Sequence, residues 1–301
     1  MRFVSVGECM VEMSESGDGL YRLGYAGDTL NTAWYARARL PKDWQVDYVT
    51  AVGDDLYSDE MLAFFAANGL GTGRIQRLAG KRPGLYLIHQ KDGDRHFTYW
   101  RGQSAAKQIA DDAEALNAAL AGADVAYFSS ISLAILAARS RGRLLKAIYN
   151  AKQGGARVAF DPNERPALWT NPKVMGSTIC AAATVADIVL PTFPDEQVLF
   201  GDASPEAVAQ RYLDWGAEEV VVKNGGEPAF VASREGQGWV APMPGAKSVD
   251  PTGAGDSFNG AYLAARAQGA APLEAAEAAH VTAAIVIGHR GALVPHTLLG
   301  N

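Results

Sequence analysis

The chain has 301 residues, of which 48% are hydrophobic and 20% are charged. These are ordinary values for a folded globular protein, so they exclude a disordered chain, and the length allows one large α/β domain. The formal net charge of -6 gives no electrostatic attraction to nucleic acid or to anionic membranes. We therefore expect neither of them as a partner.

The cysteines and the first residues indicate the cellular location of the protein. Cys9 and Cys180 are too few for a disulfide framework and have no metal-binding spacing, so both are predicted to be reduced, buried thiols. Residues 1–10 lack the apolar stretch of a signal peptide, and no later segment offers about 20 apolar residues for a membrane span. A cytoplasmic location is expected.

Short apolar runs alternate with Ala- and Leu-rich stretches along most of the chain. The runs are typical of buried strands and lie at 2–6, 46–52, 125–129, 157–161, 188–190 and 220–223. The stretches favour helices at 29–38, 60–68, 113–120, 133–151 and 205–215, and the end of the chain favours two more at 253–268 and 273–287. This alternation predicts an α/β fold with a mostly parallel sheet and helices on both faces.

Two segments interrupt the alternation. Residues 8–23 contain short strand-like runs, and residues 84–101 have the form of a hairpin with Asp92 and Gly93 at its turn. We expect about 8–25 and 84–103 to form a small β-sheet lid. Because no repeat or linker divides the chain, residues 1–301 are expected to form a single domain.

Residues 250–258 (DPTGAGDSF) carry the strongest chemical signal. They end a loop and open a helical pattern, where Gly253, Ala254 and Gly255 would direct first-turn amides at an anion. Asp256 would repel a phosphate, so its carboxylate suits a catalytic base that accepts a hydroxyl proton. The alternative is a glycine-containing helix start in which Asp256 only complements the helix dipole.

This segment resembles the DTGAGD signature of the ribokinase-like (PfkB) carbohydrate kinases. Residues 25–33 (YAGDTLNTA) resemble the second family signature, G-G-x-x-x-N, with Ala26 in place of the first glycine. Residues 52–58 resemble the family's G-x-D segment, and the three motifs occur in the family's order. The resemblance implies a Rossmann-like (ribokinase-like) fold with a β lid, and Mg²⁺- and ATP-dependent phosphorylation of a sugar hydroxyl by Asp256.

The resemblance also suggests residues for the nucleotide and the metal. Lys223 and Gly225 match the segment that faces the nucleotide phosphates, although Lys223 could equally be a strand-end surface lysine. Thr192 takes the asparagine position of the N-x-x-E metal motif, and either Asp195 or Glu196 is its acidic member. His280 either lines the adenine pocket or packs within a helix. Backbone carbonyls near Asp250 and Gly291 are candidates for a monovalent cation such as K⁺.

The segments expected to face the substrate resemble one subgroup of the family, the 2-keto-3-deoxygluconate kinases. They are RPGLY at 82–86, FTYWR at 97–101, SAA at 104–106, FSSISLAIL at 128–136 and DPNERPALW at 161–169. The implied product is 2-keto-3-deoxy-6-phosphogluconate.

A sugar acid favours arginine, because a guanidinium can bind a carboxylate bidentately. Arg101 and Arg165 are the candidates, and either could instead be solvated or structural. Tyr86 and Tyr99 would add hydroxyl contacts, with Tyr99 on the same strand face as Arg101. The remaining substrate residues implied by the resemblance are Gly27, Asp28, Asn31, Ser130 and Ile131.

Three other functions compete with this interpretation. A fructose, ribose or nucleoside kinase would leave the arginines unpaired, and a catalytically silent sugar-acid sensor would not need Asp256. A dehydrogenase is excluded, because no G-x-G-x-x-G follows the first strand. The exposed edge of the lid sheet also predicts a homo-oligomer.

Overall fold

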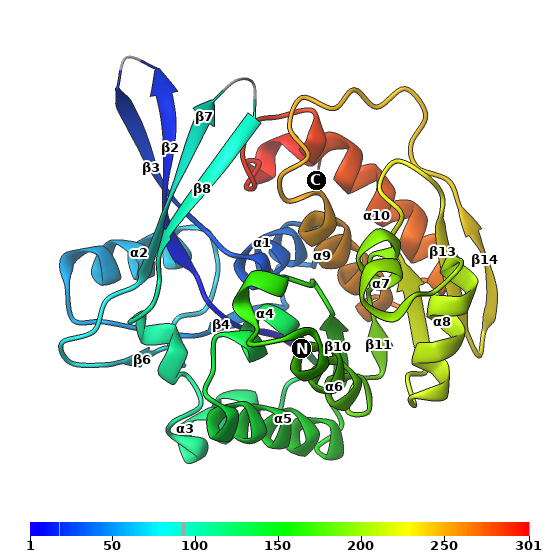
Figure 1. Cartoon of the computed structure of the whole chain (residues 1–301), viewed down its shortest axis with the longest axis horizontal. Helices are drawn as coiled ribbons and strands as arrows, with labels where there is room; N and C mark the ends of the chain where they lie inside the picture. Colours follow the sequence, from blue (N-terminus) through cyan, green and yellow to red (C-terminus); the bar gives the residue numbers. More distant parts are fainter. Residues whose placement is uncertain (18, 92–93, 301) are drawn as a thin grey trace.

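The computed structural model describes residues 1–17, 19–91 and 94–300. Within them, one large sheet has the order β14-β13-β12-β11-β10-β9-β1-β4 and is parallel except at β13 and β14 (Figure 1). Its strands are β1 (Arg2–Val6), β4 (Gln45–Val49), β9 (Val125–Ser129), β10 (Arg157–Asp161), β11 (Ile188–Val189), β12 (Glu219–Val222), β13 (Ala229–Ser233) and β14 (Gly236–Val240). The predicted α/β fold with a mostly parallel sheet is confirmed.

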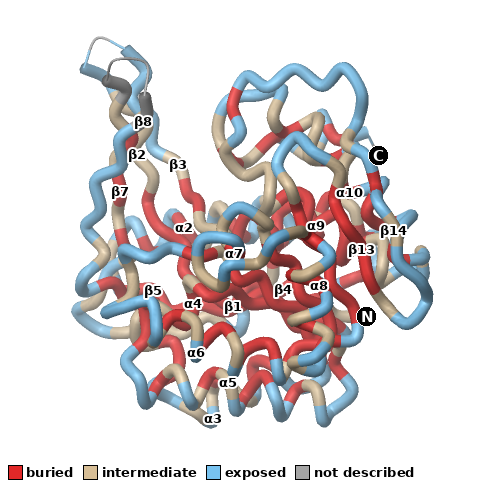
Figure 2. Tube along the Cα trace, turned by 45° about the vertical axis from the view of Figure 1, so that its right-hand side comes forward, coloured by how far each residue is buried: buried red, intermediate tan, exposed pale blue. Residues whose placement is uncertain are grey.

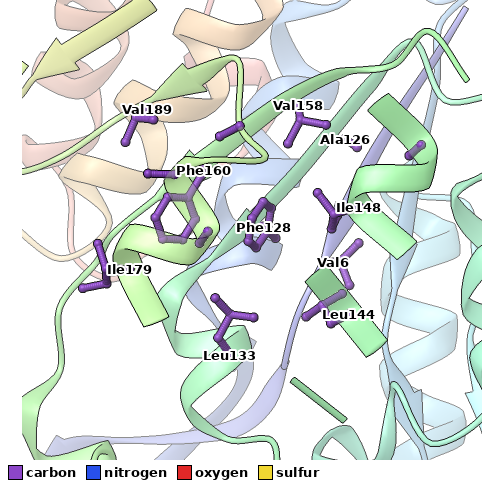
Figure 3. Packing of buried hydrophobic residues seen from close by; sticks show 14 of the residues in the cluster. Val6, Ala126, Phe128, Leu133, Leu144, Ile148, Val158, Phe160, Ile179 and Val189 are labelled. Carbon is purple, nitrogen blue, oxygen red and sulfur yellow. The ribbon is translucent and has the colours of Figure 1, made fainter. Parts of the chain in front are cut away.

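Successive side chains along the central strands enter two different cores. On β9, Phe128 packs into the core shown in Figure 3, whereas Tyr127 packs into the core on the opposite face. The Figure 3 core is covered by α3 (Ala113–Leu120), α4 (Ser130–Ala134), α5 (Ala138–Gln153), α6 (Pro172–Ala183), α7 (Phe193–Phe200) and α8 (Pro205–Asp214). The opposite core is covered by α1 (Asp28–Arg39), α2 (Leu56–Ala67), α9 (Ala254–Ala267) and α10 (Pro272–Ile287). Strands buried on both faces explain the continuous apolar runs in the sequence.

Helices from the two ends of the chain pack directly against each other. A Cβ on Gly260 of α9 would lie only 2.5 Å from the carbonyl oxygen of Thr32 in α1. This glycine therefore allows the two backbones to approach closely. The close approach sets the N-terminal ends of α1 and α9 near one another, which matters for the site.

A second sheet projects from the main body, and we call it the lid (Figures 1 and 2). Its order is β3-β2-β7-β8, with bounds β2 (Met10–Gly17), β3 (Leu20–Ala26), β7 (Gly84–Lys91) and β8 (Asp94–Trp100). The predicted hairpin is confirmed by the antiparallel pairing of β7 with β8. Its predicted turn at Asp92 and Gly93 lies outside the described residues. Two short strands, β5 (Ala51–Val52) and β6 (Gln76–Arg77), pair below it.

Two predicted elements are wrong in extent. The helix expected at 133–151 is two helices, because the chain is extended at Ala137 between α4 and α5. The strand expected at 46–52 is divided at Thr50, and its second part, β5, leaves the main sheet to pair with β6. In both places the apolar pattern continues through a change of direction, so periodicity alone does not reveal the break.

The cysteine prediction holds in part. Both thiols are free, and Cys9 is buried as expected, but Cys180 is only half-buried on α6. No helix in the described part of the chain is long and apolar enough to cross a membrane.

Candidate active site

A cavity of about 930 Å³ lies under the lid, where the parallel strands of the main sheet end. Asp161 at the end of β10 and Lys223 just after β12 line it from the sheet, and Tyr86 lines it from the lid. The carboxyl edge of an open parallel sheet is the usual ligand site of such folds.

Most of the residues that the sequence nominated line this cavity together. They are Gly27, Asp28, Asn31, Tyr86, Tyr99, Arg101, Ile131, Arg165, Thr192, Asp195, Lys223, Gly225, Gly253, Ala254, Gly255, Asp256 and His280. Ser130 and Glu196 are not among the lining residues. Ser130 is buried beneath them, and its hydroxyl donates to the carbonyl oxygen of Asn163 at 3.1 Å.

Asp256 lies in the first turn of α9, lines the cavity and contacts α1. Its Oδ2 accepts a hydrogen bond of 2.8 Å from the side-chain amide of Asn31. Burial raises the pKa of Asp256 to about 7, and the nearby Asp28 carboxylate adds to the rise, while the Asn31 hydrogen bond opposes it. A carboxylate with a pKa near neutrality is well suited to accept a proton from a hydroxyl.

The start of α9 depends on a glycine. Gly253 has φ +77°, and a Cβ there would lie 2.8 Å from the carbonyl oxygen of Ala292. The amide of Ala254 is not free as predicted, since it donates to the carbonyl oxygen of Pro251 at 3.1 Å. The amides of Gly255 and Asp256 follow in the same turn, where a helix offers no acceptor of its own. Within the described residues, no side chain caps this helix start.

A buried polar network under the cavity centres on Asp161. Its Oδ2 accepts hydrogen bonds from Lys223 Nζ at 3.0 Å and from the side-chain amide of Asn259 at 2.6 Å. Lys223 also donates to Asn259 at 3.1 Å. The predicted phosphate-facing lysine is thus a buried, partnered cation, and its ammonium has one further hydrogen to offer toward the cavity.

Asn163 connects this network to the substrate side. Its backbone amide donates to Asp161 at 2.9 Å, and its side-chain amide donates to Asp28 at 2.8 Å. Its φ of +24° is unusual for a residue other than glycine, and such strained positions gather at functional sites. Sequence reasoning quoted Asn163 within a motif but gave it no role.

The two candidate arginines differ in their surroundings. Arg101 lines the cavity, but its guanidinium already forms an ion pair with the buried Glu8. Arg165 is exposed at the cavity wall and donates to its neighbour's backbone, Glu164 O, at 2.6 Å. Among the described residues, no carboxylate forms an ion pair with Arg165.

Asp195 and Glu196 are neighbours on α7, but their side chains have different surroundings. Asp195 lines the cavity, and burial raises its pKa while Arg165 opposes the rise. Glu196 is fully buried behind it, where it accepts hydrogen bonds of 2.7 Å from both Arg211 and Tyr212. In the described chain, no cluster of three or more His, Cys, Asp or Glu side chains is arranged to hold a metal by itself.

Residues 2–297 match the model of the pfkB family carbohydrate kinases. The chain belongs to this family. It is therefore an ATP-dependent carbohydrate kinase, as the motifs predicted.

Several relatives of this kinase carry one name. A 2-dehydro-3-deoxygluconokinase of Dickeya dadantii (strain 3937) is 41% identical over 298 residues, and one of Escherichia coli (strain K12) is 40% identical. Each match covers 96% of both chains.

Solved structures agree with the fold of the kinase. A fructokinase double mutant from Vibrio cholerae O395 in its fructose-, ADP- and potassium-bound form has a TM-score of 0.84 at 26% identity, covering 99% of this chain and 94% of the other. An Escherichia coli protein assigned as Ribokinase II, in complex with ATP and Mg²⁺, has a TM-score of 0.83 at 25% identity, covering 97% and 94%.

His280 lines the kinase's cavity from α10, whereas Arg101 lines it next to the lid strand β8. Its ring meets Phe258 edge-on, with 5.1 Å between the ring centroids, and burial lowers its pKa. Its Nε2 is buried and finds no hydrogen-bond partner among the described residues. A neutral, apolar-walled histidine suits the base of a nucleotide better than a phosphate.

Proposed function

We propose that this kinase transfers the γ-phosphoryl group of ATP to the terminal hydroxyl of 2-keto-3-deoxy-D-gluconate, which is the 2-dehydro-3-deoxygluconate of its relatives' names. The product is the 6-phosphate. The observation that supports this substrate is Arg165, a guanidinium on the cavity wall that forms no ion pair in the described chain, although it lies near enough to Asp195 to lower the pKa of that carboxyl. The cavity also contains Asp28, Asp161 and Asp256, so only a local cation can attract an acidic sugar there. Relatives at about 40% identity support the same substrate.

The proposed step is an in-line transfer. The substrate hydroxyl loses its proton to Asp256 while its oxygen bonds to the γ-phosphorus. The bond from that phosphorus to the bridging oxygen breaks, and ADP leaves. The amides of Gly255 and Asp256 stabilise charge on the transferring group, a contribution of about 3 kcal/mol per donor in other enzymes.

The residues of the cavity fit a nucleotide. Glycines at 225, 253 and 255 line the cavity, and a Cβ at Gly255 would lie 3.8 Å from Lys223 Nζ. Phosphates can therefore approach both the backbone and the ammonium group. His280 and Phe258, which also line the cavity, offer an apolar surface for the base.

For Mg²⁺, the carboxylate of choice is Asp195, with Thr192 beside it on the cavity wall. One carboxylate is enough, because Mg²⁺ in kinases is held largely by phosphates and water. When bound, the ion neutralises charge on the phosphate oxygens. Glu196 does not fit this role, since Arg211 and Tyr212 already occupy its oxygens.

A monovalent cation site beside α9 belongs to the same proposal. The Asp250 carboxylate accepts the backbone amides of Thr252 at 3.0 Å and Gly291 at 2.7 Å, so it ties together the two loops that would supply carbonyl ligands. Replacing K⁺ with a bulky organic cation in the assay buffer should then lower kcat.

The function is tested by ADP release on a panel of 2-keto-3-deoxygluconate, its galacto epimer, gluconate, fructose, ribose and adenosine. We expect kcat/KM to be highest for the keto-deoxy acids and far lower, though measurable, for the neutral sugars. Arg165→Ala should raise the KM for the acid about tenfold or more, because a bidentate ion pair is lost. Arg77→Ala, an exposed arginine paired with Asp59, is the matched control.

Other outcomes identify the alternatives. Preference for fructose or ribose would show a neutral-sugar kinase. Binding of the acid without any turnover would show a sensor.

The oligomer is proposed from the lid. The edges of its sheet, β3 and β8, are uncovered, and the apolar side chains of Leu20, Phe97 and Trp100 are exposed on them. Light scattering during gel filtration should give a mass of at least twice that of one chain.

A further inference from the structure

Glu8 lies at the junction between the main sheet and the lid, in the link from β1 to β2. Its side chain is 1% exposed, and each carboxylate oxygen accepts a hydrogen bond. Oε2 accepts from Nη2 of Arg101, and Oε1 accepts from the hydroxyl of Ser104. Arg101 directly follows β8, and Ser104 precedes the short helix η1 (Ala105–Gln108). One carboxylate therefore joins three chain segments at the base of the lid.

The packing around this carboxylate leaves it little freedom. A Cβ on Gly84, the first residue of β7, would lie 3.0 Å from Oε1 of Glu8 and 3.1 Å from Cβ of Arg101. A Cβ on Gly27 would lie 2.1 Å from the carbonyl oxygen of Glu8. Glycine is needed at both places because the neighbouring chain is so close. A larger residue at Gly84 would therefore press on both Glu8 and Arg101.

The charges of Glu8 and Arg101 depend on each other. A buried carboxylate without a partner is strongly disfavoured, and so is a buried guanidinium. Burial raises the pKa of Glu8, and Arg101 is the main group opposing that rise. The side chain of Arg101 is only 15% exposed, yet it lines the cavity. The charge of Arg101 is thus compensated by an ion pair, whereas Arg165 forms no ion pair in the described chain.

We propose that Glu8 is a positioning residue for substrate recognition: it fixes Arg101 as an oriented, charge-compensated hydrogen-bond donor at the cavity wall, and leaves the carboxylate of the substrate to Arg165. This assignment of different roles to Arg101 and Arg165 rests on the proposed function, because it assumes an acidic sugar. It follows that Glu8 acts on the substrate only through Arg101.

A double-mutant cycle tests this dependence. Glu8→Ala should raise the KM for the sugar about tenfold, while the KM for ATP changes by less than about twofold, because neither Glu8 nor Arg101 is among the residues proposed to bind ATP. In an Arg101→Ala background the same change should add less than about twofold. If Glu8→Ala multiplies the KM by the same factor in both backgrounds, Glu8 has a separate structural role and the proposal fails.

Two further variants keep the cycle interpretable. Glu8→Gln preserves the size of the side chain and replaces Glu8→Ala in the cycle if the alanine variant does not fold. Glu12→Gln removes the charge of another lid carboxylate, which accepts from the Tyr86 hydroxyl, and its effect should multiply with that of Arg101→Ala. Coupling of Glu12 with Arg101 as strong as that of Glu8 would contradict a specific pair.

The charge assignment has its own test, which separates it from the proposed function. Arg165→Ala should impair turnover of the sugar acid far more than turnover of a neutral sugar, whereas Arg101→Ala should impair both by a similar factor. A selective loss of the acid in Arg101→Ala would make Arg101 the carboxylate ligand and overturn the assignment. If the wild type prefers a neutral sugar, the proposed function is wrong, and the cycle on that sugar still decides whether Glu8 acts through Arg101.

Discussion

The pKa of Asp256 depends on burial and on the charged and polar groups around it. It shares the cavity with Asp28 and Asp161, and Asn31 and Lys223 offset part of their repulsion. The pKa of this carboxyl is therefore close to neutral pH, where the group can both take up and release a proton. A lone surface aspartate would be a much weaker base.

Replacing this base should stop the reaction without unfolding the protein. We expect Asp256→Asn to lower kcat about 10²- to 10⁴-fold, the usual loss for a general base. The KM values should change little, because the amide keeps the shape of the side chain and its contact with Asn31. Steady-state ADP release measures this, with Asp59→Asn at the surface as the control. More than a tenth of wild-type activity in Asp256→Asn would assign the base elsewhere.

The pH profile should report the same carboxylate. The base acts deprotonated and its pKa is about 7, so kcat/KM should fall about tenfold per unit below pH 7 and level off above about pH 8. Because Asp28 raises the pKa of Asp256, Asp28→Asn should move the falling limb to lower pH. Measuring kcat/KM for the sugar between about pH 5.5 and 8.5 tests both statements. A limb that stays in place would mean that another group titrates.

Single residues were predictable from sequence where a motif fixes both their type and their place. Asp256, Asn31 and Gly253 lie in such motifs and meet in the cavity. The Glu8 contact with Arg101 was not predictable, since the two residues are 93 positions apart and only the folded lid brings them together. Glu196 was nominated because it is acidic and adjacent to Asp195, and only the position of Arg211 shows that it points away.

At the scale of elements, the turn into α9 sets the position of the proposed catalytic group, Asp256. Gly253 holds a backbone conformation that other residues adopt only with strain, and it does so against the backbone of Ala292. The helix start and the loop near residue 292 are thus fitted to each other. Small changes at this contact should move the first-turn amides and Asp256 together.

Gly253→Ala tests that contact. The strained φ alone costs about 1–2 kcal/mol, and the 2.8 Å approach to Ala292 adds to it. We expect a lower free energy of unfolding in urea and a raised KM for ATP. Gly255→Ala is the matched control, because its nearest neighbour would be 3.8 Å away and alanine favours a helix. Equal stability of the two variants would contradict the interpretation.

Elements with a strong period were predictable, and weakly marked ones were not. α9 and α10 begin and end within a residue or so of their expected bounds. The hairpin of β13 and β14 was missed, because Gly236 and Gly238 dilute the strand pattern of its second arm. α6 was missed as well, although Asn171 caps it and Pro172 opens it.

At the scale of the molecule, one buried carboxylate joins the sheet to α9, the helix that bears Asp256. Glu219 on β12 is 1% exposed and forms ion pairs with Arg157 of β10 at 2.8 Å and Arg266 of α9 at 2.7 Å. Tyr262 of α9 donates to it at 2.7 Å. The sheet and the last helices are therefore tied by charge as well as by apolar packing.

Removing this carboxylate should weaken the whole fold. Glu219→Ala leaves Arg266, whose side chain is 7% exposed, without its buried partner, so we expect a loss of about 3–5 kcal/mol of unfolding free energy. Urea unfolding followed by circular dichroism measures it. Glu235 also pairs with Arg266 but is 58% exposed, and Glu235→Ala should cost less than about 1 kcal/mol. Similar losses of unfolding free energy in both variants would contradict the larger contribution expected of the buried carboxylate.

The packing of α1 against α9 has a consequence for synthesis on the ribosome. Residues 1–250 contain every strand of the main sheet, but the helices that cover much of its second face, with Phe258 and Tyr262, come last. A nascent chain of that length would expose Tyr127, Ala159 and Val221 to water. Chaperone binding should therefore peak just before α9 emerges. A chain that ends before α9 should be inactive, since the proposed catalytic aspartate belongs to the helix that completes the core.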